Sequence, residues 1–334
     1  MDSITHVVLG MAEGELIAGK KLGKKAMLWG AIANSVPDID VLFTPFLSSD
    51  QGLLVHRGIT HSILFAFLFS LAAAWFFSHR NSKLDFTGWL ALWGCGMFSH
   101  ILLDSFTNYG TGWFEPFSHT RVIINNIFVA DPFYTSPLTV SAIALLLIKK
   151  YEPSRTKWAT GGLILSLVYL GYTFFNKVSI DAVAEKNFTH QKMEVKRYMT
   201  APTPLNNFLW YVLAQSDDGF YTGLYSVFDK DDSISFHFIP QNEQLVSPIS
   251  SDEKVKRLIR FTQGWYCATL DSDQNVTLND LRFGTMGFAG DEEKYVFSYS
   301  LAPDSSNGFL VHSSRFRSIP ANAFGKLIER IEGK

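Results

Sequence analysis

Histidines and aspartates gather at four points in the first third of the chain, each beside an apolar run. Imidazole nitrogens and carboxylate oxygens bind divalent metal ions, and without a cysteine among them they favour zinc, with manganese or iron as alternatives. Acids and histidines at the end of a membrane helix are costly, so they tend to mark functional sites. The candidate ligands are His6, Asp38, Asp40, His56, His61, His100 and Asp104, with Asp2 as a further candidate.

The spacing within two of these groups predicts that their members act together. Asp2 and His6 are four residues apart, as are His100 and Asp104. Residues separated by four lie on one face of a helix, so each pair can reach a common point. Two helices therefore each offer a histidine and a carboxylate to one site.

The other two groups lie between predicted helices. Asp38 and Asp40 follow a proline that should end the preceding helix. Their two carboxylates can bridge two metal ions, or one can hold an ion while the other orients a histidine. His56 and His61 directly precede the apolar run 63–77. We expect all four groups to meet at one end of a helical bundle.

The elements that must position these residues are six apolar runs. The chain has 334 residues, of which 47% are hydrophobic and 18% charged, a composition that leans toward a membrane protein. We predict a mainly α-helical membrane domain over residues 1–177, an up-down bundle with about six embedded helices. The runs cover residues 4–19, 26–36, 63–77, 86–103, 133–148 and 158–175.

The composition changes from about residue 178, where charged and polar residues become frequent. Strand-like segments such as 209–213 and two candidate helices, 252–261 and 320–331, predict a soluble α+β domain over 178–334. No catalytic motif stands out in this part of the chain.

Lysines and arginines are unevenly divided between the two sets of loops that alternate along the bundle. One set carries Arg57 and Arg121, whereas the other carries ten basic residues. Loops rich in lysine and arginine face the cytoplasm, so the four ligand groups and the C-terminal domain are expected on the extracytoplasmic side. The ten residues are Lys20, Lys21, Lys24, Lys25, Arg80, Lys83, Lys149, Lys150, Arg155 and Lys157.

The net charge and the two cysteines argue against a nucleic-acid-binding protein, a disulfide-rich protein and a cysteine metal site. The formal net charge of −2 argues against a nucleic-acid partner, because phosphate binding needs a basic surface. Cys95 and Cys267 form neither a disulfide framework nor a paired metal motif.

Each candidate residue also has a simpler interpretation. An interfacial histidine can be a polar anchor, Asp2 can cap the first helix, and Asp38 can cap a turn. Arg57 can anchor at lipid headgroups instead of holding a substrate anion. We expect Glu13 to pair with a polar group inside the bundle and not to reach the metal. The joint pattern favours a metal site over these separate interpretations.

Four short motifs in this order resemble the YdjM-type family of predicted membrane-bound metal-dependent hydrolases, over about residues 1–175. That family has a proposed distant likeness to zinc phospholipase C and P1-type nucleases. The resemblance implies a bacterial inner membrane protein whose zinc ligands are His6, Asp38, Asp40, His56, His61, His100 and Asp104. The motifs span residues 2–6, 37–40, 56–62 and 99–104.

The hypothesis from the sequence is a hydrolase in which a bound metal ion activates water to attack an ester or phosphoester. Asp40 or Asp104, whichever is not fully used as a ligand, would be the general base. Arg57 would hold an anionic group of the substrate. A site at the membrane interface suggests a lipid or lipid-linked substrate. The alternative is a non-enzymatic membrane protein with a structural or sensory metal site and an outer domain that binds a partner.

Overall fold

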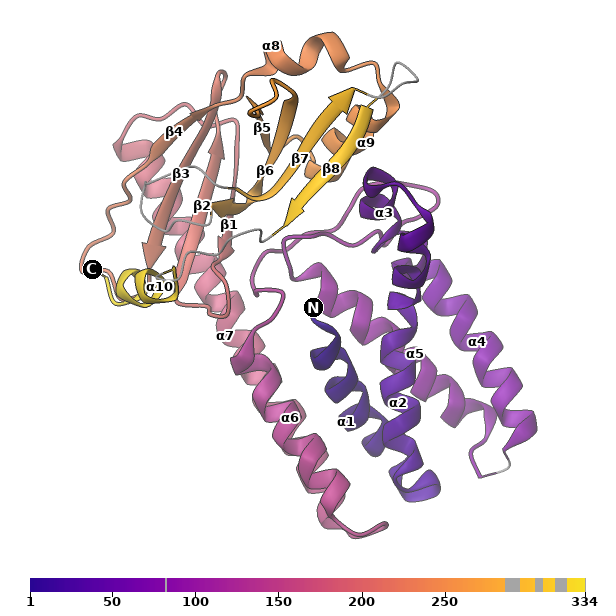
Figure 1. The fold of residues 1–334 in the computed structure, drawn as a ribbon. Helices are drawn as coiled ribbons and strands as arrows, with labels where there is room; N and C mark the ends of the chain where they lie inside the picture. The colour runs from indigo at the N-terminus through magenta and orange to yellow at the C-terminus, as the bar shows by residue number, and fades with distance from the viewer. Residues whose placement is uncertain (82, 286–294, 304–308, 316–322, 334) are drawn as a thin grey trace. The chain divides into compact units, whose positions relative to one another are not determined.

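A computed structural model describes the chain except for residues 82, 286–294, 304–308, 316–322 and 334 (Figure 1). The described residues divide into two compact units. The helical unit contains Met1–Leu42, Val55–Asn176 and Pro204–Asn207. The C-terminal unit contains Phe43–Leu54, Lys177–Thr203 and the chain from Phe208 onward.

Each predicted apolar run contains a helix, but the prediction of about six embedded helices is not supported. Among the described residues, three helices, α4, α5 and α7, are long and apolar enough to cross a membrane. Helix α2 has 11 residues and is therefore roughly 16 Å long, well short of about 30 Å of hydrocarbon. The helices are α1 (Ser3–Leu22), α2 (Lys25–Ser35), α4 (Ile63–Arg80), α5 (Phe86–Ser105), α6 (Pro132–Leu147) and α7 (Ser154–His190).

Short helical segments connect α2 to α4 at the end of the bundle that carries the candidate ligands. They are η1 (Val36–Phe46), α3 (Ser49–Val55) and η2 (Ile59–His61). The Ser62 hydroxyl accepts from the backbone N–H of Phe65 and so caps the start of α4. This cap fixes where η2 ends and the long apolar helix begins.

Glycines let α1, α2 and α5 pack closely (Figure 1). A Cβ built on Gly30 of α2 would lie 2.0 Å from the carbonyl oxygen of Gly10 and 2.8 Å from the Cα of Gly14 in α1. A Cβ on Gly96 of α5 would lie 2.8 Å from the Cβ of Ala33. Small residues at helix crossings allow backbones to approach in membrane bundles. The crossings therefore hold α2 tightly between its neighbours.

One of the ten basic residues counted for the loops, Arg155, lies in the first turn of α7 and is buried. Arg155 is 2% exposed and makes two contacts with the Glu15 carboxylate, of 2.8 and 2.6 Å. Its guanidinium also donates to the carbonyl oxygen of Leu145. A buried arginine needs such a carboxylate partner, and Glu15 on the face of α1 supplies it.

The C-terminal unit contains two four-stranded antiparallel sheets, each with its strands in chain order. The predicted helix over 158–175 is too short, because α7 continues to His190 and its last turns pack Ile180, Ala184 and Phe188 on the first sheet. The strands are β1 (Arg197–Pro202), β2 (Leu209–Gln215), β3 (Gly219–Ser226), β4 (His237–Pro240), β5 (Tyr266–Leu270), β6 (Val276–Thr285), β7 (Tyr295–Pro303) and β8 (Phe309–Arg315). The further helices are α8 (Glu243–Val246), η3 (Ser247–Ile249), α9 (Glu253–Thr262) and α10 (Ala323–Ile331).

The close contact of Gly30 with α1 predicts that two glycine-to-alanine substitutions differ in their effect on the free energy of unfolding. Gly30→Ala should lower the free energy of unfolding by about 1–3 kcal/mol, because the new methyl group meets backbone atoms that cannot move aside. Gly94→Ala in α5 places its methyl in open space and should stabilise the protein by up to about 1 kcal/mol through helix propensity. Thermal unfolding in detergent measures both, and equal effects would show that the crossing is not tightly packed.

Candidate metal centre

Four segments of the helical unit bring the candidate ligands together. Helix α1 supplies His6, and α5 supplies His100 and Asp104 one turn apart, as their spacing predicts. The 3-10 helix η1 supplies Asp38 and Asp40, and the segment from α3 to η2 supplies His56 and His61.

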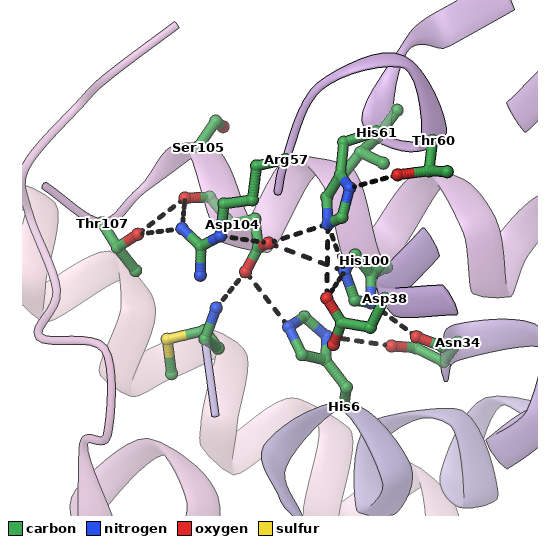
Figure 2. Close-up of polar contacts among 12 residues, drawn as sticks. His6, Asn34, Asp38, Arg57, Thr60, His61, His100, Asp104, Ser105 and Thr107 are labelled. Atoms are coloured by element: carbon green, nitrogen blue, oxygen red, sulfur yellow. Dashed lines mark hydrogen bonds and ion pairs between the residues drawn. The ribbon is translucent and has the colours of Figure 1, made fainter. Parts of the chain in front are cut away.

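Four of these side chains point one atom each at a common point (Figure 2). The Nε2 atoms of His61 and His100 are 3.1 Å apart. His61 Nε2 lies 3.4 Å from Asp38 Oδ1 and 3.4 Å from Asp104 Oδ2, and His100 Nε2 lies 3.6 Å from each of the same two oxygens. We call Asp38, His61, His100 and Asp104 the four-residue group; it could hold a metal ion.

Hydrogen bonds at the other ring nitrogens explain why both Nε2 atoms face inward. His100 Nδ1 lies 2.5 Å from the carbonyl oxygen of Asn34, which can only accept, so Nδ1 carries the hydrogen. The Thr60 hydroxyl donates to Asp40, so it accepts from His61 Nδ1 at 3.1 Å. In their neutral forms both imidazoles therefore direct an Nε2 lone pair at the centre of the group.

Asp104 is almost fully buried, at 1% exposure. Its Oδ2 atom has no hydrogen-bond partner among the described residues and lies 3.4 Å from His61 Nε2 and 3.6 Å from His100 Nε2. The Nε atom of Arg57 lies 3.0 Å from Oδ2 in an ion pair, and His6 Nε2 lies 3.1 Å from Oδ1. The Met1 amino group also contacts Oδ1. Figure 2 shows these groups converging on one carboxylate.

A second group shares Asp38 with the first. Asp38, Asp40 and His56 each offer one ligand atom within 4.8 Å of the others. Asp40 Oδ1 accepts from His56 Nδ1 at 3.1 Å, while Asp40 Oδ2 accepts from the backbone N–H of Arg57 and from the Thr60 hydroxyl. Three donors thus hold the Asp40 carboxylate in place.

The electrostatics of the site favour a bound cation. Burial alone would raise the pKa of Asp38, but the imidazoles of His100 and His61 beside it hold the pKa well below its usual range. Burial alone would lower the pKa of His61, but the carboxylates of Asp104, Asp38 and Asp40 raise it to about 9. Without a metal ion, a proton on His61 supplies the positive charge at the centre of the four-residue group.

Asp2 caps the first helix, as its simpler interpretation predicts, and Arg57 is enclosed by protein contacts. Asp2 lies outside both groups and caps α1, accepting from the backbone N–H groups of Ile4 and Thr5. Arg57 is 3% exposed, and its guanidinium contacts Asp104 and the Thr107 hydroxyl. A side chain so enclosed by protein contacts positions Asp104 and does not reach outward to the lipid headgroups.

Sequence reasoning did not single out Asn34, Thr60 and Thr107, which contact the histidines and Arg57 directly. Asn34 had a visible signal, because it is an amide inside an otherwise apolar run. The expectation for Glu13 is confirmed: its carboxylate accepts from the Asn34 amide and the Ser99 hydroxyl.

The helices and the site define a membrane protein with a buried cluster of histidines and aspartates that could hold a metal ion. The model of the YdjM inner membrane protein family matches residues 1–180, just over half of the chain, so the chain belongs to this family. The resemblance predicted from the four motifs is therefore confirmed.

Two relatives extend the comparison. The chain is 32% identical over 142 residues to the inner membrane protein YbcI of Escherichia coli (strain K12), covering 40% of this chain and 81% of YbcI. It is 24% identical over 306 residues to the protein YfhP of Bacillus subtilis (strain 168), covering 86% and 88% of the two chains. No solved structure matches the chain.

The position of Arg57 generates a stability prediction. Arg57→Gln should lower the free energy of unfolding of the metal-free protein by about 3–5 kcal/mol, because it leaves the Asp104 charge buried without its guanidinium partner. Arg80→Gln, at the exposed end of α4, is the matched control and should change stability little. Thermal unfolding in detergent measures both, and equal small effects would rule out a positioning role for Arg57.

Proposed function

We propose that this protein is a membrane-bound, metal-dependent hydrolase, with the four-residue group as its principal metal site. The observation that carries the proposal is the convergence of two Nε2 lone pairs and two carboxylate oxygens on one buried point. Such an arrangement is repulsive unless a cation occupies it, so its persistence in a low-dielectric bundle supports a metal ion.

The distances within the group support zinc. A tetrahedral ion with bonds of about 2.0–2.1 Å needs ligand atoms about 3.3–3.4 Å apart. Five of the six separations among Asp38, His61, His100 and Asp104 range from 3.1 to 3.6 Å, and the sixth is within 4.8 Å. Two nitrogens and two oxygens also suit zinc better than softer ions, because no thiolate is present in the group.

The surroundings offer room for more than one ion. Asp38 is common to both groups and can bridge them. His6 Nε2 and Asp104 Oδ1 lie 3.1 Å apart on another side of the same carboxylate. We therefore propose Asp40, His56 and His6 as ligands or orienting residues of a second ion, with Asp38 or Asp104 as the shared carboxylate.

A bound divalent ion supplies a Lewis acid that polarises the scissile group and activates water near neutral pH. The chain's own residues orient the reactants. Asp40 lies outside the four-residue group, so we propose it as the general base. The three donors that hold its carboxylate suit it equally to orienting His56 and His61. Arg57 keeps Asp104 ionised and turned toward the centre.

The location of the site supports a lipid or lipid-linked ester or phosphoester as substrate. The ligands lie at the start of α4 and the end of α5, two of the candidate membrane spans. Large apolar side chains of the ligand segment η1 are exposed, including Ile39 at 45% and Leu42 at 68%. Apolar side chains at an interface can enter the bilayer surface, which would bring a lipid headgroup to the site.

The outward orientation of the site and of the C-terminal unit stays a prediction from the lysine and arginine count. A cysteine introduced at exposed Asp273 should react with a membrane-impermeant maleimide in intact cells or spheroplasts. Labelling only after the membrane is opened would place the C-terminal unit in the cytoplasm.

Metal content is the first prediction of this proposal. Protein purified in detergent should contain about one zinc ion per chain or more, as expected for a group with four ligands. His61→Ala and His100→Ala should lose most of this metal, whereas His79→Ala, at the other end of α4, should keep it. Elemental analysis of the three variants checks this, and wild-type protein without stoichiometric metal would contradict the proposal.

An assay of hydrolysis distinguishes the two functional hypotheses. The alternative to a hydrolase is a structural or sensory metal site with an outer unit that binds a partner. Wild-type protein should hydrolyse a phosphodiester or lipid ester, lose this activity on chelation and recover it with zinc. His61→Ala should lower the rate at least about 100-fold, as removal of a catalytic metal ligand does. Metal binding without any chelator-sensitive turnover in a screen of both ester classes would favour the structural or sensory site.

A further inference from the structure

We propose that Asn34 positions both His6 and His100, and that Glu13 and Ser99 hold the Asn34 amide in the required orientation. This inference rests on the proposed function, since it concerns how the histidines present their nitrogens to a metal ion. Asn34, Glu13 and Ser99 are called the Asn34 network below. None of the three is a candidate metal ligand.

Asn34 contacts the two histidines through different atoms. Its backbone carbonyl oxygen accepts from His100 Nδ1 at 2.5 Å, and its side-chain Oδ1 lies 3.1 Å from His6 Nδ1. The two imidazoles stack with their ring centroids 3.7 Å apart and an angle of 21° between planes. A displacement of this one residue would therefore turn both rings.

The hydrogen-bond partners of Asn34 decide which end of its amide faces His6. The Nδ2 group donates to Glu13 Oε2 at 3.2 Å and to Ser99 Oγ at 2.8 Å. Ser99 in turn donates to Glu13 Oε2 at 3.0 Å, so its oxygen is left to accept. A flipped amide would place Oδ1 against the Glu13 carboxylate, which is electrostatically unfavourable.

The fixed amide selects the tautomer of His6. Because Oδ1 can only accept, it favours a hydrogen on His6 Nδ1, in competition with the Asp104 carboxylate at Nε2, and so favours the tautomer whose Nε2 lone pair is available to a metal ion. Partners that set the tautomer of a ligating histidine in this way commonly change metal affinity about 10–100-fold when they are removed.

Packing keeps this arrangement rigid but does not require an amide. Asn34 is fully buried, and a Cβ on Gly10 would lie 2.7 Å from the Cβ of Asn34, while one on Gly96 would lie 3.0 Å from its backbone nitrogen. A leucine has similar volume and would avoid the cost of burying polar groups in an apolar bundle. The buried polar network therefore points to a positioning role.

The test compares Asn34→Leu and Glu13→Gln in the full-length protein in detergent. Asn34→Leu keeps the carbonyl for His100 and removes the partner of His6, and it should weaken zinc binding about 10–100-fold in competition with a chelator. Glu13→Gln is nearly isosteric but allows the amide to flip, so it should convert part of His6 to the Nε2–H tautomer. Nuclear magnetic resonance of 15N-labelled histidine detects this change, with His6→Gln identifying the signal.

Ser141→Ala is the matched control, because Ser141 donates to the carbonyl oxygen of Trp158, outside the metal site. It should leave zinc affinity and the His6 signal unchanged. Unchanged zinc affinity in Asn34→Leu, or an unchanged His6 tautomer in Glu13→Gln, would overturn the positioning role of Asn34. Zinc binding by the wild type would then still support the proposed function. Absence of zinc binding by the wild type would instead overturn the proposed function.

Discussion

The burial of the Asp104 carboxylate is the constraint on which the rest of the site depends. An ionised acid at 1% exposure in an apolar bundle is tolerated only with positive charge and hydrogen bonds around it. Arg57 supplies part of that positive charge, and the imidazoles of His6, His61 and His100 lie beside the carboxylate oxygens of Asp104. The site therefore has the electrostatic character of a cation-binding centre whether the cation is a proton or a metal ion.

The positions of these groups follow from the close packing of the helices. Gly10, Gly14 and Gly30 allow α1 and α2 to touch along their backbones, and Gly96 brings α5 against α2. This packing stacks His6 on His100 and places Asn34 against the Nδ1 atoms of both rings. Short-range contacts in a rigid bundle can hold ligand atoms to within a few tenths of an ångström, which loops alone seldom achieve.

Much of the site could be predicted from the sequence because its signals are local. The i, i+4 spacing of His100 and Asp104 and the position of His61 before an apolar run are properties of short segments. The partners of these ligands were harder to find, because Asn34 and Thr60 act through contacts set by helix packing. The ion pair of Arg57 with Asp104 could not be foreseen for the same reason, because the two residues are distant in the chain.

The overall fold was predictable to a similar degree. Hydropathy located the long helices of the described chain, but three of them qualify as membrane spans, and α2 with its 11 residues is too short to be one. The end of α7 was missed since Ile180, Ala184 and Phe188 alternate with charged residues, a pattern that looks polar until the sheet beneath it is known. Family membership adds an inner-membrane setting to this fold and does not by itself establish catalysis.

The most direct measurement is crystallography of the zinc-loaded protein with anomalous data on both sides of the zinc absorption edge. The account predicts an anomalous peak bounded by Asp38 Oδ1, His61 Nε2, His100 Nε2 and Asp104 Oδ2, at bond lengths of about 2.0–2.2 Å. Loss of that peak in His61→Ala crystals would show that these residues hold the ion. A zinc-loaded crystal with no peak at this point, and with His61 hydrogen-bonded directly to Asp104, would contradict the central claim.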